Sequence, residues 1–151
     1  MKKRRTRSKV KNVKKQIYKG ITFQSKLELY CYKTLNSFKI PVDYEKTTFT
    51  IFDALVYPQA CYEGTKKKLY NKGSKIRAIT YTPDFVDPEG KWIIETKGYL
   101  PSHHDFPMRW KIFLNHIMNN NLGYDVYLAR NKQQVDQAVD EILKSIQNDK
   151  G

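Results

Sequence analysis

Residues 80–98 read TYTPDFVDPEGKWIIETKG, and this stretch decides the fold because two runs of β-forming residues flank one turn. The turn is Asp87-Pro88-Glu89-Gly90, whose residue types favour a tight reversal of the chain. We therefore expect an antiparallel hairpin between residues 78–86 and residues 91–98. This hairpin supplies two strands of a predicted β-sheet.

The second strand of the hairpin combines apolar residues with charged ones. Side chains alternate across a strand, so Glu95 and Lys97 point to the same face. The run Trp92–Ile94 makes the strand apolar on both sides, which is typical of a buried strand. An ionised Glu and Lys are costly in such a strand unless they are paired or bound to a metal ion.

Two interpretations of these charges remain open. The first is a plain ion pair at the end of the sheet, either Glu95 with Lys97 or Asp84 with Lys97. In the second, the hairpin brings Asp84 and Glu95 together, and the two carboxylates repel each other unless a divalent cation such as Mg²⁺ neutralises both. Such a cation activates water for attack on a phosphodiester, and Lys97 would orient that water or share the developing charge.

Hydrophobic periodicity predicts the other elements and gives the order αβββαβα, a mixed α+β fold in which helices flank the sheet. The length of 151 residues suits one domain of ordinary size. In chain order, the predicted elements are a helix that starts at Ser25, a strand at 46–52, the hairpin strands at 78–86 and 91–98, a helix after Pro107, a strand at 124–130 and a helix over 135–146.

The net charge of +13 indicates a polyanionic partner. Nucleic acid is favoured over a membrane surface, because no apolar run approaches the roughly 18 residues of a spanning helix. The N-terminus has no apolar stretch that could serve as a signal peptide, so we expect a cytoplasmic protein, in the host cytoplasm if a phage encodes it. Cys31 and Cys61 lie far apart and suggest neither a disulfide framework nor a zinc module.

Two segments hold most of the basic excess. Residues 1–19 contain ten Lys or Arg and no acid, so we expect a basic arm that contacts phosphates; the alternative is a solvated, repelling tail. Residues 53–78 are predicted to be an irregular, basic insertion within a single domain over 20–151. The predicted DNA contacts are Lys2, Lys3, Arg4, Arg5, Arg7, Lys66, Lys67, Lys68, Arg109 and Lys111.

Pro83-Asp84 followed by Glu95-Thr96-Lys97 resembles the PD-(D/E)xK nuclease signature. Together with FQSKLE at 23–28, the TYTPDF and ETKG motifs are similar in order and spacing to the phage endonuclease I type of Holliday-junction resolvase. The resemblance covers residues 20–115. It implies a PD-(D/E)xK nuclease core and a homodimer that cuts branched DNA.

The same resemblance implies site residues and a cofactor. Its catalytic residues fall on Glu28, Asp84, Glu95 and Lys97. Mg²⁺, for which Mn²⁺ would substitute, is expected to bind Asp84, Glu95 and the backbone carbonyl of Thr96. His103 and His104 are assigned no catalytic role.

Alternatives to this interpretation remain. Ser25-x-x-Glu28 before an apolar run is also a capping box, in which Glu28 serves only the helix N-terminus. The catalytic and capping roles can coexist only if the Glu28 carboxylate faces the sheet. The whole chain could also be a nuclease for duplex or nicked DNA, or a non-catalytic basic protein that binds nucleic acid.

Overall fold

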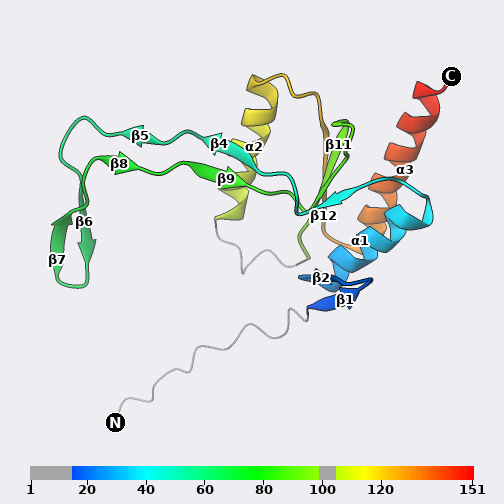
Figure 1. The fold of residues 1–151 in the computed structure, drawn as a ribbon, viewed down its shortest axis with the longest axis horizontal. Helices are drawn as coiled ribbons and strands as arrows, with labels where there is room; N and C mark the ends of the chain where they lie inside the picture. Colours follow the sequence, from blue (N-terminus) through cyan, green and yellow to red (C-terminus); the bar gives the residue numbers. More distant parts are fainter. Residues whose placement is uncertain (1–14, 99–104) are drawn as a thin grey trace, which may run out of the picture.

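The computed structural model describes residues 15–98 and 105–151, in which three helices and twelve short strands form a mixed α+β fold (Figure 1). The N-terminal half contains β1 (Gln16–Tyr18), β2 (Ile21–Phe23), α1 (Lys26–Ser37), β3 (Asp43–Tyr44), β4 (Phe49–Phe52), β5 (Leu55–Val56), β6 (Tyr62–Thr65) and β7 (Lys68–Asn71). The C-terminal half contains β8 (Lys75–Ile76), β9 (Ile79–Tyr81), β10 (Phe85–Val86), β11 (Trp92–Thr96), α2 (Phe106–Asn119), β12 (Asp125–Ala129) and α3 (Lys132–Asp149).

The predicted hairpin is present as β10 and β11. The two strands run antiparallel, with Phe85 opposite Ile94 and Val86 opposite Ile93. Gly90 closes the turn at φ +78°, a left-handed conformation that favours glycine. The hairpin is therefore confirmed at the turn where its residue types predicted it.

The first hairpin strand is shorter than predicted. Residues 78–86 were expected to form one strand, but they divide into β9 and β10. The division falls at Pro83, which has no backbone N–H to donate to a sheet. β9 pairs with β4 instead, so residues 82–84 form a corner between two sheets.

Four strands form the central sheet in the order β12-β11-β10-β3, with β11 and β12 parallel. Trp92 and Ile94 pack in one hydrophobic cluster with residues of α1 and α3, while Ile93 packs in a second cluster with residues of α2. All five residues of β11 are buried, as the apolar run Trp92–Ile94 predicted. The sheet thus lies between two layers of helix, and β11 is its buried centre.

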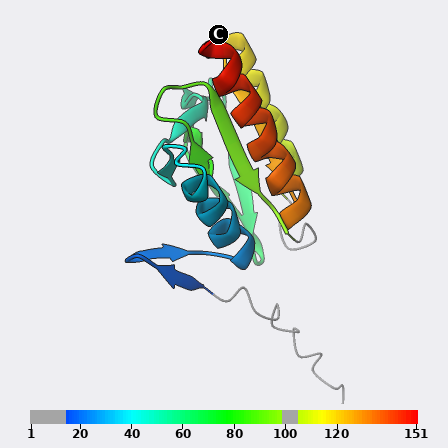
Figure 2. The same ribbon diagram turned by 90° about the vertical axis from the view of Figure 1, so that its right-hand side faces the viewer.

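Helix α1 begins where the sequence predicted. Ser25 is the N-cap, and its Oγ accepts a hydrogen bond of 3.1 Å from the Glu28 N–H. The β1–β2 hairpin precedes α1 and contacts it, and Figure 2 shows this hairpin beside the first turn of the helix. Cys31 and Leu35 of α1 pack in the core cluster, so the face of the helix that also carries Glu28 is turned toward the sheet.

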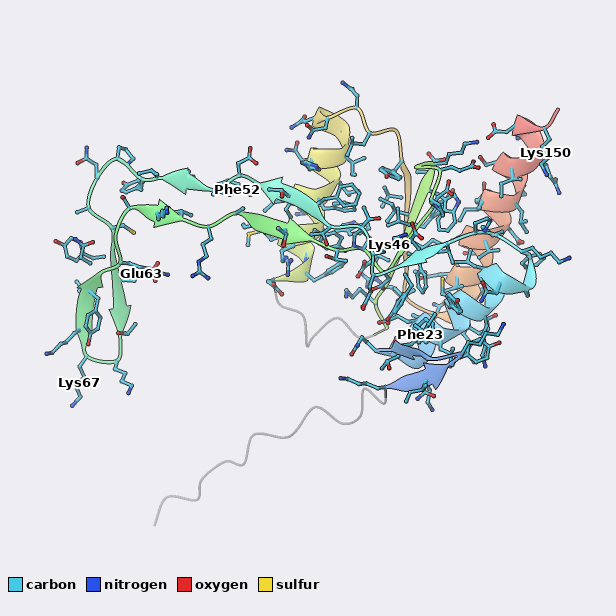
Figure 3. All side chains as sticks on the ribbon, viewed as in Figure 1. Phe23, Lys46, Phe52, Glu63, Lys67 and Lys150 are labelled. Atoms are coloured by element: carbon cyan, nitrogen blue, oxygen red, sulfur yellow. The ribbon has the colours of Figure 1, made fainter. Side chains whose placement is uncertain are left out.

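Residues 53–78 are not the irregular insertion that the sequence predicted. They form a two-stranded ribbon in which β5 pairs with β8 and β6 pairs with β7, both antiparallel. The ribbon extends away from the central sheet, with Phe52 at its base and Lys67 at its far tip (Figure 3). This turn was not predicted, because the reversal at Lys66-Lys67 contains neither Gly nor Asn.

Some predicted features lie outside the described residues. They include Lys2, Lys3, Arg4, Arg5 and Arg7 of the basic arm. His103 and His104 also lie outside them. Within the described residues, no helix has the length and apolar character needed to cross a membrane.

Replacing Ser25 with Ala is expected to lower the free energy of unfolding by about 1 kcal/mol, because the Glu28 N–H would lose its acceptor. Urea denaturation measures this loss. Ser25→Thr keeps a hydroxyl acceptor and is the matched control. An equal loss in both variants would contradict the capping role.

Candidate active site

Asp84 and Glu95 lie side by side where β10 meets β11. The Asp84 N–H donates a hydrogen bond of 3.2 Å to Glu95 Oε2. Asp84 Oδ2 accepts two hydrogen bonds of 2.8 Å, one from the Thr96 N–H and one from the Thr96 hydroxyl. Asp84 and Glu95 are only 6% and 3% exposed. The hairpin therefore brings together the two predicted carboxylates and buries both.

The charge of Asp84 is poorly compensated in this position. Burial raises the pKa of Asp84 well above its ordinary value, and the nearby Glu95 and Glu28 carboxylates raise it further. The two hydrogen bonds from Thr96 act in the opposite direction without cancelling this rise. The site thus favours any bound positive charge, which is the electrostatic condition for a cation site.

Lys97 forms one of the two ion pairs that were possible from the sequence. Its Nζ lies 3.0 Å from Glu95 Oε1 and 5.1 Å from the centre of the Phe106 ring. Burial lowers the pKa of Lys97, but the Glu95 carboxylate and then the Asp84 charge outweigh burial, so its pKa is raised. Lys97 therefore carries its charge beside Glu95, and of the two predicted pairs the structure forms Glu95 with Lys97.

Glu28 caps its helix and also reaches the sheet. Its Oε2 accepts hydrogen bonds from the Gln24 N–H at 3.0 Å and from the Tyr44 hydroxyl at 2.6 Å. Tyr44 lies in β3, so the Glu28 carboxylate is turned toward the sheet. The condition under which capping and a site role can coexist is therefore met.

Glu45 is a site residue that the sequence analysis missed. One oxygen from each of Glu28, Glu45 and Asp84 lies within 4.8 Å of the others. The Glu45 N–H donates to the Asp84 carbonyl at 2.9 Å, and its φ of 46° is left-handed. Burial and then the Glu28 charge raise the pKa of Glu45. No local motif marks Glu45, because only the pairing of β3 with β10 brings it to Asp84.

Tyr81 and Arg109 border the carboxylates on the side of α2. The Tyr81 hydroxyl is buried beside Glu95, and burial, then the Glu95 charge and side-chain hydrogen bonding to Glu95, raise its pKa. The Arg109 guanidinium lies 5.9 Å from the Tyr81 ring centre and donates to the Thr80 carbonyl at 2.6 Å. Of the two basic residues predicted on this helix, Arg109 thus lies beside the site, whereas Lys111 is exposed.

The donor set fits a hard divalent cation, since Mg²⁺ prefers carboxylate and carbonyl oxygens. The predicted ligands were Asp84, Glu95 and the Thr96 carbonyl. The structure brings one oxygen each of Asp84, Glu28 and Glu45 within 4.8 Å of one another, while both Glu95 oxygens already accept from Lys97 or from the Asp84 N–H. Asp84 is common to both sets and is therefore the central candidate ligand.

Residues 7–133 match the model of a family described as "Protein of unknown function (DUF1064)". The chain belongs to the DUF1064 family. No curated protein and no solved structure matches it significantly. The DUF1064 match spans every candidate site residue, from Glu28 to Arg109.

Replacing Asp84 with Asn is expected to raise the melting temperature of the metal-free protein by a few degrees at neutral pH. The raised native pKa of Asp84 means that its contribution to stability is present at acidic pH and is lost as pH rises through that pKa. The Asn amide still accepts from Thr96 but carries no charge. Thermal unfolding across pH measures the difference, which should shrink toward acidic pH.

The control for this prediction is Asp140→Asn, an equal charge change at an exposed position on α3. Added Mg²⁺ should raise the melting temperature of the wild type and of the control more than that of Asp84→Asn. An Asp84→Asn protein that is less stable at every pH and gains as much from Mg²⁺ would refute the cation site.

Proposed function

We propose that this protein is a metal-dependent DNA endonuclease with a PD-(D/E)xK-type centre, which hydrolyses phosphodiester bonds in branched DNA as a homodimer. One observation carries the proposal. The buried carboxylate of Asp84 lies between Glu95, which pairs with Lys97, and Glu28. These are the four residues that the sequence resemblance implies for catalysis.

Mg²⁺, or Mn²⁺ in its place, would be held by Asp84 together with carboxylates from Glu28, Glu45 and Glu95 and the Thr96 carbonyl. Such a cation supplies positive charge for the phosphorane-like transition state and lowers the pKa of bound water. The raised pKa of Asp84 supports this assignment, since it reports uncompensated negative charge. The buried Tyr81 hydroxyl beside Glu95 also supports it, because it places a neutral hydrogen-bond donor next to the carboxylates.

The chain's own groups have separate tasks in this reaction. Lys97, charged and 20% exposed, would orient the attacking water and share the charge that develops on the oxyanion. Tyr81 stays protonated because its pKa is raised, so its hydroxyl can donate to a phosphate oxygen. Arg109, whose Nε is buried without a partner among the described residues, would bind the phosphate beside it.

The substrate follows from charge and from the resemblance. The net charge of +13 favours a polyanion, phosphodiester cleavage makes that polyanion a nucleic acid, and the resemblance makes it DNA. The preference for branched DNA rests on the resemblance to phage junction resolvases. A nuclease for duplex or nicked DNA is the alternative, and it predicts equal cleavage of junctions and matched linear duplexes.

Asp84→Asn and Lys97→Ala are each expected to reduce the rate of strand cleavage by about 100-fold or more, with DNA binding retained. The assay follows labelled four-way junctions and matched linear duplexes, with and without Mg²⁺. Lys46→Ala removes the same charge from an exposed lysine that pairs with Asp43, and it is the control for Lys97. Wild-type cleavage by homogeneous Asp84→Asn protein would refute the proposed centre.

Tyr81→Phe is expected to lower the melting temperature only slightly, because Glu95, the acceptor beside the lost hydroxyl, keeps its ion pair with Lys97. Cleavage should fall by about tenfold if that hydroxyl donates to the phosphate. Tyr127→Phe, on β12, makes the same chemical change away from the carboxylates. Unchanged cleavage in Tyr81→Phe would remove this residue from the mechanism.

A further inference from the structure

The β5–β8 ribbon is an exposed element that nothing in the fold covers. Between residues 52 and 80, every residue except Cys61 is exposed. A two-stranded hairpin alone is marginally stable in water, because it has no second layer to bury its apolar side chains. Here Val56 is 68% exposed and Leu69 is 72% exposed. Such a surface marks an interaction site.

The charge of the ribbon selects the kind of partner. Residues 53–78 contain six basic side chains and only two acidic ones, Asp53 and Glu63. Glu63 is already paired with Lys72 at 2.9 Å, so it compensates part of the charge within the ribbon. The turn at the far tip carries the consecutive lysines Lys66, Lys67 and Lys68. The surface is thus complementary to a polyanion.

The register of β6 and β7 gives the hairpin two different faces. Thr65 pairs with Lys68, and Glu63 pairs with Tyr70, so alternation places Lys68 and Tyr70 on one face. Leu69 lies on the opposite face, opposite Gly64. One face can therefore contact phosphates while the other offers apolar contact. A protein element that enters a DNA groove meets both the phosphate backbone and the base edges, so it needs both charged and apolar contacts.

The backbone at the tip adds a further observation. Lys66 has a φ of 54°, in the left-handed region where hairpin turns favour Gly or Asn. The turn therefore carries a lysine at a position where a smaller residue would fit with less strain. A lysine at this strained position is explained if its positive charge contacts the partner.

We propose that the ribbon lies in the major groove of a duplex segment of the substrate, within about one helical turn of the scissile phosphate. The major groove accepts a two-stranded β-ribbon. Fully extended at about 3.3 Å per residue, the chain from Phe52 to Thr65 would span about 40 Å, and the bend between β5 and β6 (Figure 1) brings the tip closer than that, within reach of the roughly 34 Å of one turn. The inference deepens the proposed function and rests on it in taking DNA as the partner.

The test measures DNA binding in the absence of divalent metal, so that no cleavage is required. Lys67→Gln/Lys68→Gln removes two charges from the tip of the ribbon. Lys144→Gln/Lys150→Gln removes two exposed charges at the C-terminal end of α3, at the opposite end of the molecule (Figure 3). The probes are linear duplexes of about 8 and about 24 base pairs, which are shorter and longer than one turn.

For the longer duplex, the ribbon variant is expected to flatten the slope of log K against log salt by up to about 1.8, for two lost phosphate contacts. The α3 control should keep the wild-type slope. The short duplex should show a smaller difference between the wild type and the ribbon variant, because it cannot contact the body of the fold and the tip at the same time. Lys66→Gly should also weaken binding of the longer duplex while leaving the melting temperature unchanged or higher.

An unchanged slope in the ribbon variant overturns the proposal, as does equal flattening in the α3 control. Excision of residues 53–78, with an Asn-Gly turn joining Phe52 to Ile79, tests whether the ribbon binds a second copy of the chain instead of DNA. If the excised protein turns from a dimer into a monomer with an unchanged salt slope, the ribbon binds a second copy of the chain and not DNA. If the binding results are as expected but the wild-type protein does not cleave DNA with Mg²⁺, the proposed function is overturned and the ribbon proposal is not.

Discussion

The site depends on the burial of one carboxylate, Asp84, and on the hydrogen bonds that hold it. The N–H and hydroxyl of Thr96 both donate to Asp84 Oδ2, so its position is fixed from across the hairpin. These bonds do not neutralise its charge, and Glu95 and Glu28 add more negative charge nearby. The fold tolerates this arrangement because the surrounding sheet is rigid and well packed. Strain of this kind is concentrated at functional sites, where a ligand relieves it.

The rigidity comes from β11, which is buried on both faces. Its apolar residues join two hydrophobic clusters, one with α1 and α3 and the other with α2. Glu95 and Thr96 follow directly in the same strand, so the packing of the core also holds these two residues in place. Parallel pairing with β12 continues to the end of the strand, where the Lys97 N–H donates to the Ala129 carbonyl at 2.9 Å. Functional groups on such a strand are held more closely than groups on a loop.

Charge is divided between the interior and the outside of the protein. Glu28, Asp84 and Glu95 are buried, while all six basic side chains of residues 53–78 are exposed. This division suits a protein that attracts a polyanion over long range and concentrates a cation at one point. The ribbon extends the basic surface beyond the body of the fold, and it could do so only because its strands satisfy each other's backbone groups.

The sequence by itself determined the features that depend on neighbours along the chain. Turn chemistry predicted the β10–β11 hairpin, strand alternation put Glu95 and Lys97 on one face, and the capping box placed the start of α1 at Ser25. Where a lysine-rich turn carried no such signal, the ribbon was missed. The signature residues Asp84, Glu95 and Lys97 could be named in advance because they all lie within the one hairpin of residues 80–98.

The tertiary structure alone decided which groups meet at Asp84. Glu45 reaches it through the pairing of β3 with β10 and a left-handed φ, neither of which any local pattern encodes. The break of residues 78–86 at Pro83 likewise depends on β9 finding β4 as its partner. Periodicity and turn preferences act over a few residues, whereas the approach of Glu28, Glu45 and Asp84 is set by packing between elements up to 56 residues apart in the sequence.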